Sequence, residues 1–216
     1  MDPRDRRLEA DARKVREMVA NSDLIEATAI DARDGRPPEI WEITYRCRGI
    51  IGANRDGSPI YGDYHRVRIE LGREYPRQPP KLRWLTPIKH PNIEGYGDFR
   101  VCIDQAHWQV GQTLDRIILM MGEMVQYKNY HAQNTAPWPL DSKAAEWARK
   151  AERAGYFSKS KPVDPRPLLR PDASASSRPA PPANRPSRVM FKGNPISVPP
   201  ATPVGGSRIR ITGDRP

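Results

Sequence analysis

The stretch HPNIEGYGDFRVCIDQAHW, residues 90–108, organises the interpretation of this chain. It holds Cys102, one of two cysteines among the 216 residues, in a polar loop that follows a His-Pro-Asn step. A loop cysteine is a candidate nucleophile, because thiolates attack acyl groups well and leave readily. The opposite interpretation is also open, since free cysteines are often buried and inert. The residues on either side are needed to choose between the two.

Composition narrows the class of protein. Cys47 and Cys102 are too few for a disulfide framework, and no cluster has the spacing of zinc ligands. No apolar run approaches the length of a membrane span, and the N-terminus lacks the apolar core of a secretory signal. We therefore predict a soluble, cytoplasmic protein of a reducing compartment, with no metal, no cofactor and no membrane contact.

The net charge of +10 is concentrated near the C-terminus, where residues 157–216 hold 11 basic and 3 acidic side chains. Thirteen of the 24 prolines lie there as well, so this segment cannot bury enough apolar surface to fold. We predict a folded domain over residues 1–156 and a disordered Pro/Arg-rich tail over 157–216. The arginines of the tail are not interleaved with aromatic residues, since Phe191 stands nearly alone, which argues against nucleic acid as the main partner.

Periodicity predicts the order of the elements in the domain. Apolar residues at helical spacing indicate a helix over residues 4–21, with its arginines on a solvated face. Alternating or β-branched patterns predict strands at 40–47, 64–71 and 81–85, with turn chemistry at 54–58. Cys47 and His65 fall within these strands, Cys47 as a packed residue and His65 as an exposed one. Thr113 is a candidate N-cap for a central helix, and a short helix follows from about Asp141 to Arg153. This order predicts an α+β fold with helices packed on an antiparallel sheet.

Five separated motifs fall in a fixed order around the loop cysteine. They are Tyr75-Pro-x-x-Pro79-Pro80, His90-Pro91-Asn92-Ile93, Val101-Cys102-Ile103-Asp104, Trp108 and Thr113-Leu114. This set resembles the signature of ubiquitin-conjugating enzymes and covers about residues 1–153. The resemblance implies that family's fold: an N-terminal helix, a four-stranded antiparallel sheet, an active-site loop, a central helix and a short C-terminal helix.

The resemblance also implies a chemistry for three residues. Cys102 would accept the C-terminal glycine of a ubiquitin-like protein from an activating enzyme as a thioester, and pass it to an amine of a protein substrate. Asn92 would steady the loop and donate a hydrogen bond to the oxyanion. Asp104 would orient or deprotonate the incoming amine, and an exposed solubilising role for it is equally open.

Three further positions of the motifs are expected to be structural. His90 would hydrogen-bond the loop backbone and Pro91 would fix its path, so His90 is not a general base. Trp108 would anchor the core. The alternative function is a catalytically inactive module of the same fold that binds a ubiquitin-like protein. The presence of both Cys102 and Asn92 argues against that alternative.

The sequence departs from the family pattern in the loops. The ten-residue step from Asn92 to Cys102 is slightly longer than is common, and predicts a reshaped loop. Arg77 and Val110 stand where many members have phenylalanine and proline, in loops that contact ubiquitin ligases, which argues against a standard RING or HECT ligase. The acidic residue expected after the central helix has no clear match, and a surface role is preferred for His131 over that of a substitute base. With these departures the chain resembles a bacterial relative, encoded with its own ubiquitin-like protein, more than a eukaryotic enzyme.

Overall fold

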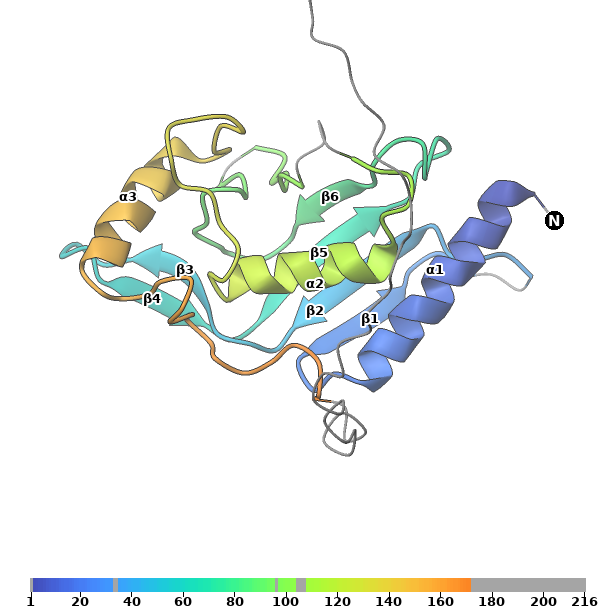
Figure 1. Ribbon diagram of the computed structural model, residues 1–216, viewed down its shortest axis with the longest axis horizontal. Helices are drawn as coiled ribbons and strands as arrows, with labels where there is room; N and C mark the ends of the chain where they lie inside the picture. Colours follow the sequence, from blue (N-terminus) through green and yellow to red (C-terminus); the bar gives the residue numbers. More distant parts are fainter. Residues whose placement is uncertain (1, 33–34, 96, 104–107, 172–216) are drawn as a thin grey trace, which may run out of the picture. The chain divides into compact units, whose positions relative to one another are not determined.

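The computed structural model describes residues 2–32, 35–95, 97–103 and 108–171, which form three helices and six strands. In chain order these are α1 (Pro3–Ala20), β1 (Ile25–Ala29), β2 (Ile40–Tyr45), β3 (Gly49–Ala53), β4 (Pro59–Gly62), β5 (His65–Glu70), β6 (Lys81–Trp84), α2 (Leu114–Val125) and α3 (Ser142–Arg153). Figure 1 shows α1 and α2 against the sheet and α3 beside the β3–β4 hairpin. The predicted α+β fold, with an N-terminal helix, a four-stranded antiparallel sheet, a central helix and a short C-terminal helix, is confirmed. Among the described residues, no helix is both long enough and apolar enough to cross a membrane.

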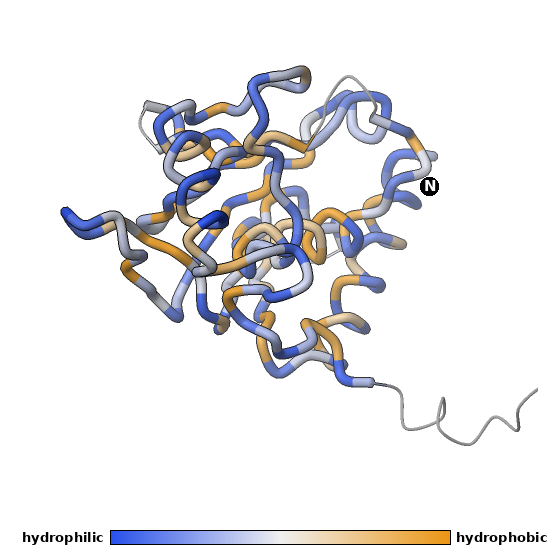
Figure 2. The backbone as a smooth tube through the Cα atoms, turned by 60° about the vertical axis from the view of Figure 1, so that its left-hand side comes forward, coloured by the Kyte–Doolittle hydropathy of each residue, from blue (hydrophilic) through white to orange (hydrophobic). Residues whose placement is uncertain are grey.

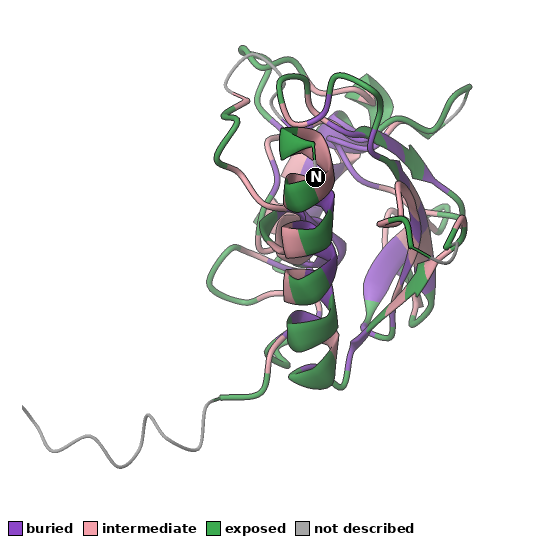
Figure 3. Cartoon of the chain, turned by 90° about the vertical axis from the view of Figure 1, so that its right-hand side faces the viewer, coloured by how far each residue is buried: buried purple, intermediate pink, exposed green. Residues whose placement is uncertain are grey.

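Four strands form an antiparallel sheet in the order β1-β2-β5-β6. The alternation along each strand turns one set of side chains toward the helices, because successive residues of a strand point to opposite faces. Cross-strand partners such as Ile43 and Val67, or Ile69 and Leu82, are buried together on this inner face. In Figure 3 the buried residues lie between the helices and the sheet. The burial pattern seen in the sequence therefore fixes which face of the sheet receives the helices.

Helix α2 supplies the apolar surface that closes this core. Its buried residues recur at helical spacing and are Leu114, Ile117, Ile118, Met121, Gly122, Met124 and Val125. Figure 2 shows hydrophobic segments gathered in the interior and hydrophilic ones at the loop tips. Burial of this face stabilises the fold by roughly 2 kcal/mol for each large side chain.

Some strands were not evident from periodicity. The short strand β1 and the β3–β4 hairpin had no clear pattern, and only the turn at 54–58 was predicted. The hairpin has an irregular register between Ile50 and Gly52, so its side chains do not alternate cleanly. Strand β2 ends at Tyr45, so Cys47 lies beyond the strand, although it is buried.

The expectation that His65 is exposed was wrong. The residue begins β5, is fully buried, and its Nε2 lies 3.0 Å from the carbonyl oxygen of Gly62. Burial lowers the pKa of His65 below its usual value. Space for the ring comes from Gly49, where an added Cβ would lie 2.6 Å from that Nε2. The alternating pattern of β5 could not reveal this, because the space for the ring depends on a glycine, Gly49, in another strand.

The arginines of α1 do not all form a solvated face, which corrects a second expectation. Arg7 donates to the carboxylate of Asp11 at 2.8 Å and to the hydroxyl of Tyr75 at 3.0 Å. Asp11 is buried and accepts the N–H of Leu114, the first residue of α2, at 3.2 Å. Thr113 occupies the predicted N-cap position but makes no side-chain cap bond. A carboxylate from α1 therefore satisfies a free N–H at the start of α2.

The packed chain continues beyond residue 156, where composition had placed the domain boundary. The segment 157–171, here called the C-terminal strap, buries Phe157 and Leu168. Val163 donates its N–H to the carbonyl of Gln126 at 2.9 Å, and Ser22 donates to the carbonyl of Leu168. The strap thus connects α2 to the turn between α1 and β1. The remaining part of the predicted tail, 172–216, lies outside the described residues.

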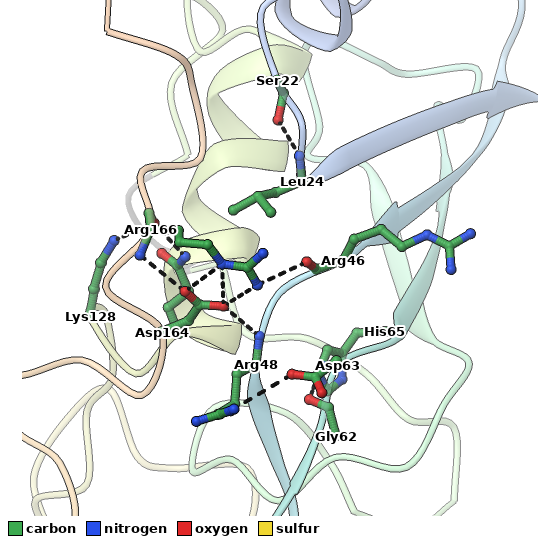
Figure 4. A network of polar contacts seen from close by, with 11 residues as sticks. Ser22, Leu24, Arg46, Arg48, Gly62, Asp63, His65, Lys128, Asp164 and Arg166 are labelled. Atoms are coloured by element: carbon green, nitrogen blue, oxygen red, sulfur yellow. Dashed lines mark hydrogen bonds and ion pairs between the residues drawn. The ribbon is translucent and has the colours of Figure 1, made fainter.

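An ion pair between the buried carboxylate of Asp164 and the exposed guanidinium of Arg166 holds the middle of the strap (Figure 4). The Asp164 carboxylate accepts from the guanidinium of Arg166 at 2.6 Å and from the N–H of Arg48 at 2.7 Å. Arg166 also donates to the carbonyl of Arg46 at 3.2 Å. Burial alone raises the pKa of Asp164, but the hydrogen bonds from Arg166 and Arg48 outweigh it and lower the pKa to about 2. The carboxylate therefore stays ionised, and satisfies backbone N–H groups that the strap would otherwise bury unpaired.

Truncating Leu168 is expected to destabilise the domain. Its side chain covers Gly122 of α2, where an added Cβ would come 2.8 Å from a Leu168 methyl carbon. The Leu168→Ala substitution should lower the free energy of unfolding by about 2–3 kcal/mol, because it leaves a cavity in the core. Urea denaturation of the full chain measures this loss. The matched control is Leu169→Ala, which removes a partly buried neighbour and should lose less than half as much. Equal losses would contradict the packing described for the strap.

Candidate active site

Residues 90–103, here called the site loop, fold back on themselves through backbone hydrogen bonds. Ile93 bridges to both His90 and Val101. The N–H of Glu94 donates to the carbonyl of Arg100 at 2.9 Å, and the N–H of Cys102 donates to the carbonyl of Asn92 at 2.9 Å. These bonds place Cys102 beside Asn92, although the two are ten positions apart in the sequence.

The extra length of the loop is closed by an ion pair and a turn. Arg100 and Glu94 approach to 3.1 Å between guanidinium and carboxylate. At the tip, Gly97 has φ 75° and Phe99 has φ 52°, a left-handed conformation that is unusual for a phenylalanine. Such a residue is held by its surroundings, here by a bond from the N–H of Trp84 to the Phe99 carbonyl at 2.8 Å. The Glu94–Arg100 ion pair and the Trp84–Phe99 hydrogen bond therefore hold the described ends of this turn.

The two cysteines differ in how far they are buried. Cys102 is free and partly buried, whereas Cys47 is free and fully buried. Burial, helped by the nearby Asp164, raises the pKa of the Cys47 thiol to about 12. Cys47 is therefore a protonated core residue, because only the thiolate is a strong nucleophile. Cys102 is the candidate nucleophile among the two.

His90 lies beneath the loop and is fully buried. Its Nδ1 accepts the N–H of Asn92 at 3.1 Å, and its ring packs edge-on against Tyr127 with 4.9 Å between centroids. Burial lowers the pKa of His90 to about 3, so the ring is neutral at physiological pH. A general base must reach the reacting group, whereas this ring is fully buried, bonded to the backbone of Asn92 and packed on Tyr127.

The Asn92 side chain connects the site loop to the loop that follows α2. Its Oδ1 accepts the N–H of His131 at 2.7 Å, and its Nδ2 lies 3.3 Å from the His131 carbonyl oxygen. An amide nitrogen has two hydrogens, so one remains for another acceptor while the first faces His131. The arrangement fits a clamp between two loops, and leaves a donor for the chemistry expected of Asn92.

The other predicted positions are placed as follows. Pro91 is buried, and its carbonyl accepts the N–H of Asp141 at 3.1 Å. Trp108 is partly buried at the edge of the core, where its Nε1 donates to the carbonyl of Pro76 at 2.9 Å. Asp104 lies outside the described residues. Within the described part of the chain, no three His, Cys, Asp or Glu side chains gather as a metal site would require.

Comparison with known proteins identifies the family. Residues 41–161, more than half of the chain, match the family of ubiquitin-conjugating enzymes. The chain belongs to the ubiquitin-conjugating enzyme family. It is 34% identical over 124 residues to ubiquitin-conjugating enzyme E2 T of Xenopus laevis, covering 52% of this chain and 56% of that one. It is 45% identical over 84 residues to ubiquitin-conjugating enzyme E2 T of Danio rerio, covering 34% and 41%. The chain thus spans about half the length of these curated relatives.

Among solved structures, one described as a novel ubiquitin-conjugating enzyme superposes with a TM-score of 0.49 and 22% identity. The match covers 68% of this chain and 86% of that one.

Several residues of this ubiquitin-conjugating domain were not found from the sequence as contributors to the site. Asp141 caps α3 by accepting the N–H of Ala144 at 2.8 Å, while its other oxygen lies against Gly95 of the site loop. His131 contributes its backbone, rather than its ring, as the partner of Asn92. A helix start could be predicted near Asp141 from local sequence, but a contact with a loop some fifty residues earlier has no local signal.

The positions that depart from the family pattern lie on the surface. Arg77 is exposed, and Val110 is 54% exposed. The Val110 carbonyl accepts a hydrogen bond from the guanidinium of Arg7 at 2.6 Å, so a side chain of α1 fixes the backbone of this loop. The side chains at both positions are therefore available to partners, with a chemistry that differs from the common phenylalanine and proline.

The buried imidazole predicts a pH dependence of stability. An unfolded histidine titrates near 6.5, whereas burial lowers the pKa of His90 to about 3. Between these values only the unfolded state binds the proton, so stability is present above pH 6.5 and is lost as the pH falls. From pH 6 to pH 5 the free energy of unfolding should fall by about 1 kcal/mol for this histidine. His65 acts in the same direction, because its pKa is also lowered.

A comparison with His90→Asn isolates the contribution of His90. Urea denaturation at pH 7, 6 and 5 should show a shallower pH dependence in the variant, by about 1 kcal/mol over the last unit. His65 remains in both proteins, so its contribution cancels. Parallel curves for the two proteins would contradict a neutral, buried His90.

Proposed function

We propose that this protein is a conjugating enzyme that accepts a ubiquitin-like protein on Cys102 as a thioester and transfers it to an amine of a protein substrate. The observation that carries the proposal is a partly accessible cysteine beside Asn92, at the end of a loop held by backbone bonds. Membership of the ubiquitin-conjugating enzyme family supports the reaction class. The partners are then an activating enzyme, a ubiquitin-like protein and the substrate.

The chemistry consists of two acyl exchanges. In the first, the Cys102 thiolate attacks the thioester carbonyl on the activating enzyme; a new carbon–sulfur bond forms and the old one breaks. In the second, a neutral amine attacks the carbonyl on Cys102, an amide bond forms, the Cys102 thiolate leaves, and the amine loses a proton to solvent. A thioester keeps the carbonyl reactive, so no cofactor is needed for either step.

Two neighbouring residues assist the second step. The free N–H of the Asn92 amide donates to the oxyanion, which is where negative charge develops. Asp104 orients the amine from the position two residues after the nucleophile. His90 and Pro91 hold the loop through their contacts with Asn92 and Asp141.

The direct test reconstitutes the first exchange. The full chain is incubated with an activating enzyme, ATP and a ubiquitin-like protein, and separated without reductant. We expect an adduct with the combined mass of the two proteins, which disappears on addition of a thiol. Binding of the ubiquitin-like protein without any adduct, at any concentration, would instead support the alternative of an inactive binding module.

The setting that we propose is a bacterial conjugation system with its own ubiquitin-like protein, acting without a standard RING or HECT ligase. Arg77 and Val110 support this, because both are exposed and differ from the residues common at ligase-contacting loops. Neighbouring genes for an activating enzyme and a ubiquitin-like protein are the expected observation. Stimulation of transfer by a standard RING domain would contradict the ligase part of the proposal.

A further inference from the structure

Three arginines lie side by side on the outer face of the sheet, next to the site loop. Arg68 of β5 is the register partner of Arg83 of β6, and Arg83 forms a bridge with Arg100 of the site loop. We call these residues the arginine row. Arg68 and Arg83 each stand between two buried residues and Arg100 is exposed, so all three project away from the core.

Such a row is unfavourable for the isolated fold, because like charges directly opposite one another in a sheet repel. Arg100 is relieved by Glu94 at 3.1 Å. The guanidinium of Arg68 lies 3.9 Å from the carboxylate of Glu42. That carboxylate also pairs with Arg66, so it neutralises Arg68 only in part. Among the described ion pairs none involves Arg83. The middle of the row is therefore a guanidinium with no carboxylate partner in the described chain.

The row lines a groove with a volume of about 380 Å³. Its charged residues are Arg68, Lys81, Arg83 and Arg100 on the basic side and Glu70 and Asp98 on the acidic side. Glu70 is the register partner of Lys81, so these two charges offset each other. The remaining positive charge is concentrated at Arg83 and Arg68.

The groove lies within reach of the nucleophile. Val101, which precedes Cys102, is part of its lining. Arg100 and Cys102 are two residues apart in an extended segment, about 7 Å along the chain, and register partners such as Arg83 and Arg100 are about 5 Å apart. The distance from Cys102 to Arg100 and Arg83 is therefore about that covered by two to four residues of an extended peptide.

We propose that this groove binds a carboxylate side chain of the protein substrate, two to four residues from the lysine that is modified. The inference rests on the proposed function and assigns a substrate preference to it. Paired guanidinium groups suit a carboxylate, since their planar forks match its two oxygens. Glu70 and Asp98 at the edges of the groove would repel a long polyanion, which favours a single carboxylate over a nucleic-acid backbone.

The test compares two peptides with one central lysine. One carries glutamates at the second to fourth positions on both sides, and the other carries glutamines there. The full chain is first loaded with the ubiquitin-like protein, and the rate of single-turnover discharge to each peptide is measured. We expect the glutamate peptide to react about tenfold faster, as a charge-assisted hydrogen bond to arginine allows.

Charge reversal identifies the residue responsible. Arg83→Glu should reduce the ratio of the two rates to about one or below, whereas Arg153→Glu, an exposed arginine on α3, should keep the wild-type ratio. The basic residues of 172–216 are the same in all three proteins, so they do not affect the comparison. A ratio near one in the wild type, or an unchanged ratio in Arg83→Glu, would overturn the proposal.

A second measurement separates this inference from the proposed function. Titration of the unloaded protein with each peptide, followed by NMR, reports binding at Arg83 without any thioester. If the wild type fails to load, the proposed function fails, and the titration alone decides the subsite. Arg83-dependent binding of the glutamate peptide supports it, and equal binding of both peptides overturns it. Arg83-dependent binding of a single-stranded oligonucleotide in preference to the glutamate peptide would overturn the assignment to a carboxylate.

Discussion

Replacing Cys102 by alanine is expected to abolish the thiol-sensitive adduct completely, because no other described thiol can take its place. Cys47 is the second cysteine of the chain, but burial raises its pKa to about 12 and removes its sulfur from solvent. Cys102 is partly accessible, and its N–H is bonded to the Asn92 carbonyl, so alanine can replace it without loss of that bond. The measurement is the reconstituted loading reaction, separated without reductant.

Two variants control this experiment. Cys102→Ser should give an adduct that survives a thiol, since an oxygen ester replaces the thioester. Cys47→Ala should keep the thiol-sensitive adduct, although it should lower the free energy of unfolding by about 1 kcal/mol because it leaves a small cavity. Loss of the adduct in Cys47→Ala, with a normal circular dichroism spectrum, would show that the assignment of the nucleophile is wrong.

Asn92→Ala is expected to slow discharge of the loaded protein to free lysine by about 100-fold, the scale on which a lost oxyanion donor acts. The first exchange should be affected less, because much of the machinery for it belongs to the activating enzyme. Asn92 also clamps the backbone of His131 through both polar atoms of its amide. Loading and discharge must therefore be measured on the same preparation.

The ratio of the two defects distinguishes the roles of Asn92. A discharge defect much larger than the loading defect supports donation to the oxyanion. Equal defects would mean that Asn92 mainly holds the loop after α2 in place. His131→Ala is the matched control, since the clamp uses only the His131 backbone and this variant should leave discharge near the wild-type rate.

The site loop illustrates how far local sequence reaches. Periodicity predicted the order of helices and strands, since a helix or a strand reveals its buried face through the spacing of its apolar residues. The family resemblance carried by the motifs around Cys102 indicated that residue as the candidate nucleophile. The long step from Asn92 to Cys102 indicated a changed loop. How the loop closes, through Glu94, Arg100 and a left-handed Phe99, depends on contacts that sequence spacing does not encode.

What the sequence by itself determined was the α+β class of the fold and the identity of a candidate cysteine. The tertiary structure alone decided which partners the polar groups have. It paired Asn92 with His131, placed Asp11 under the first turn of α2, and carried the chain past residue 156 to bury Leu168. The physical reason is that periodicity reports only that a side chain faces the core. Which group it meets there is set by the packing of segments that lie tens of residues apart.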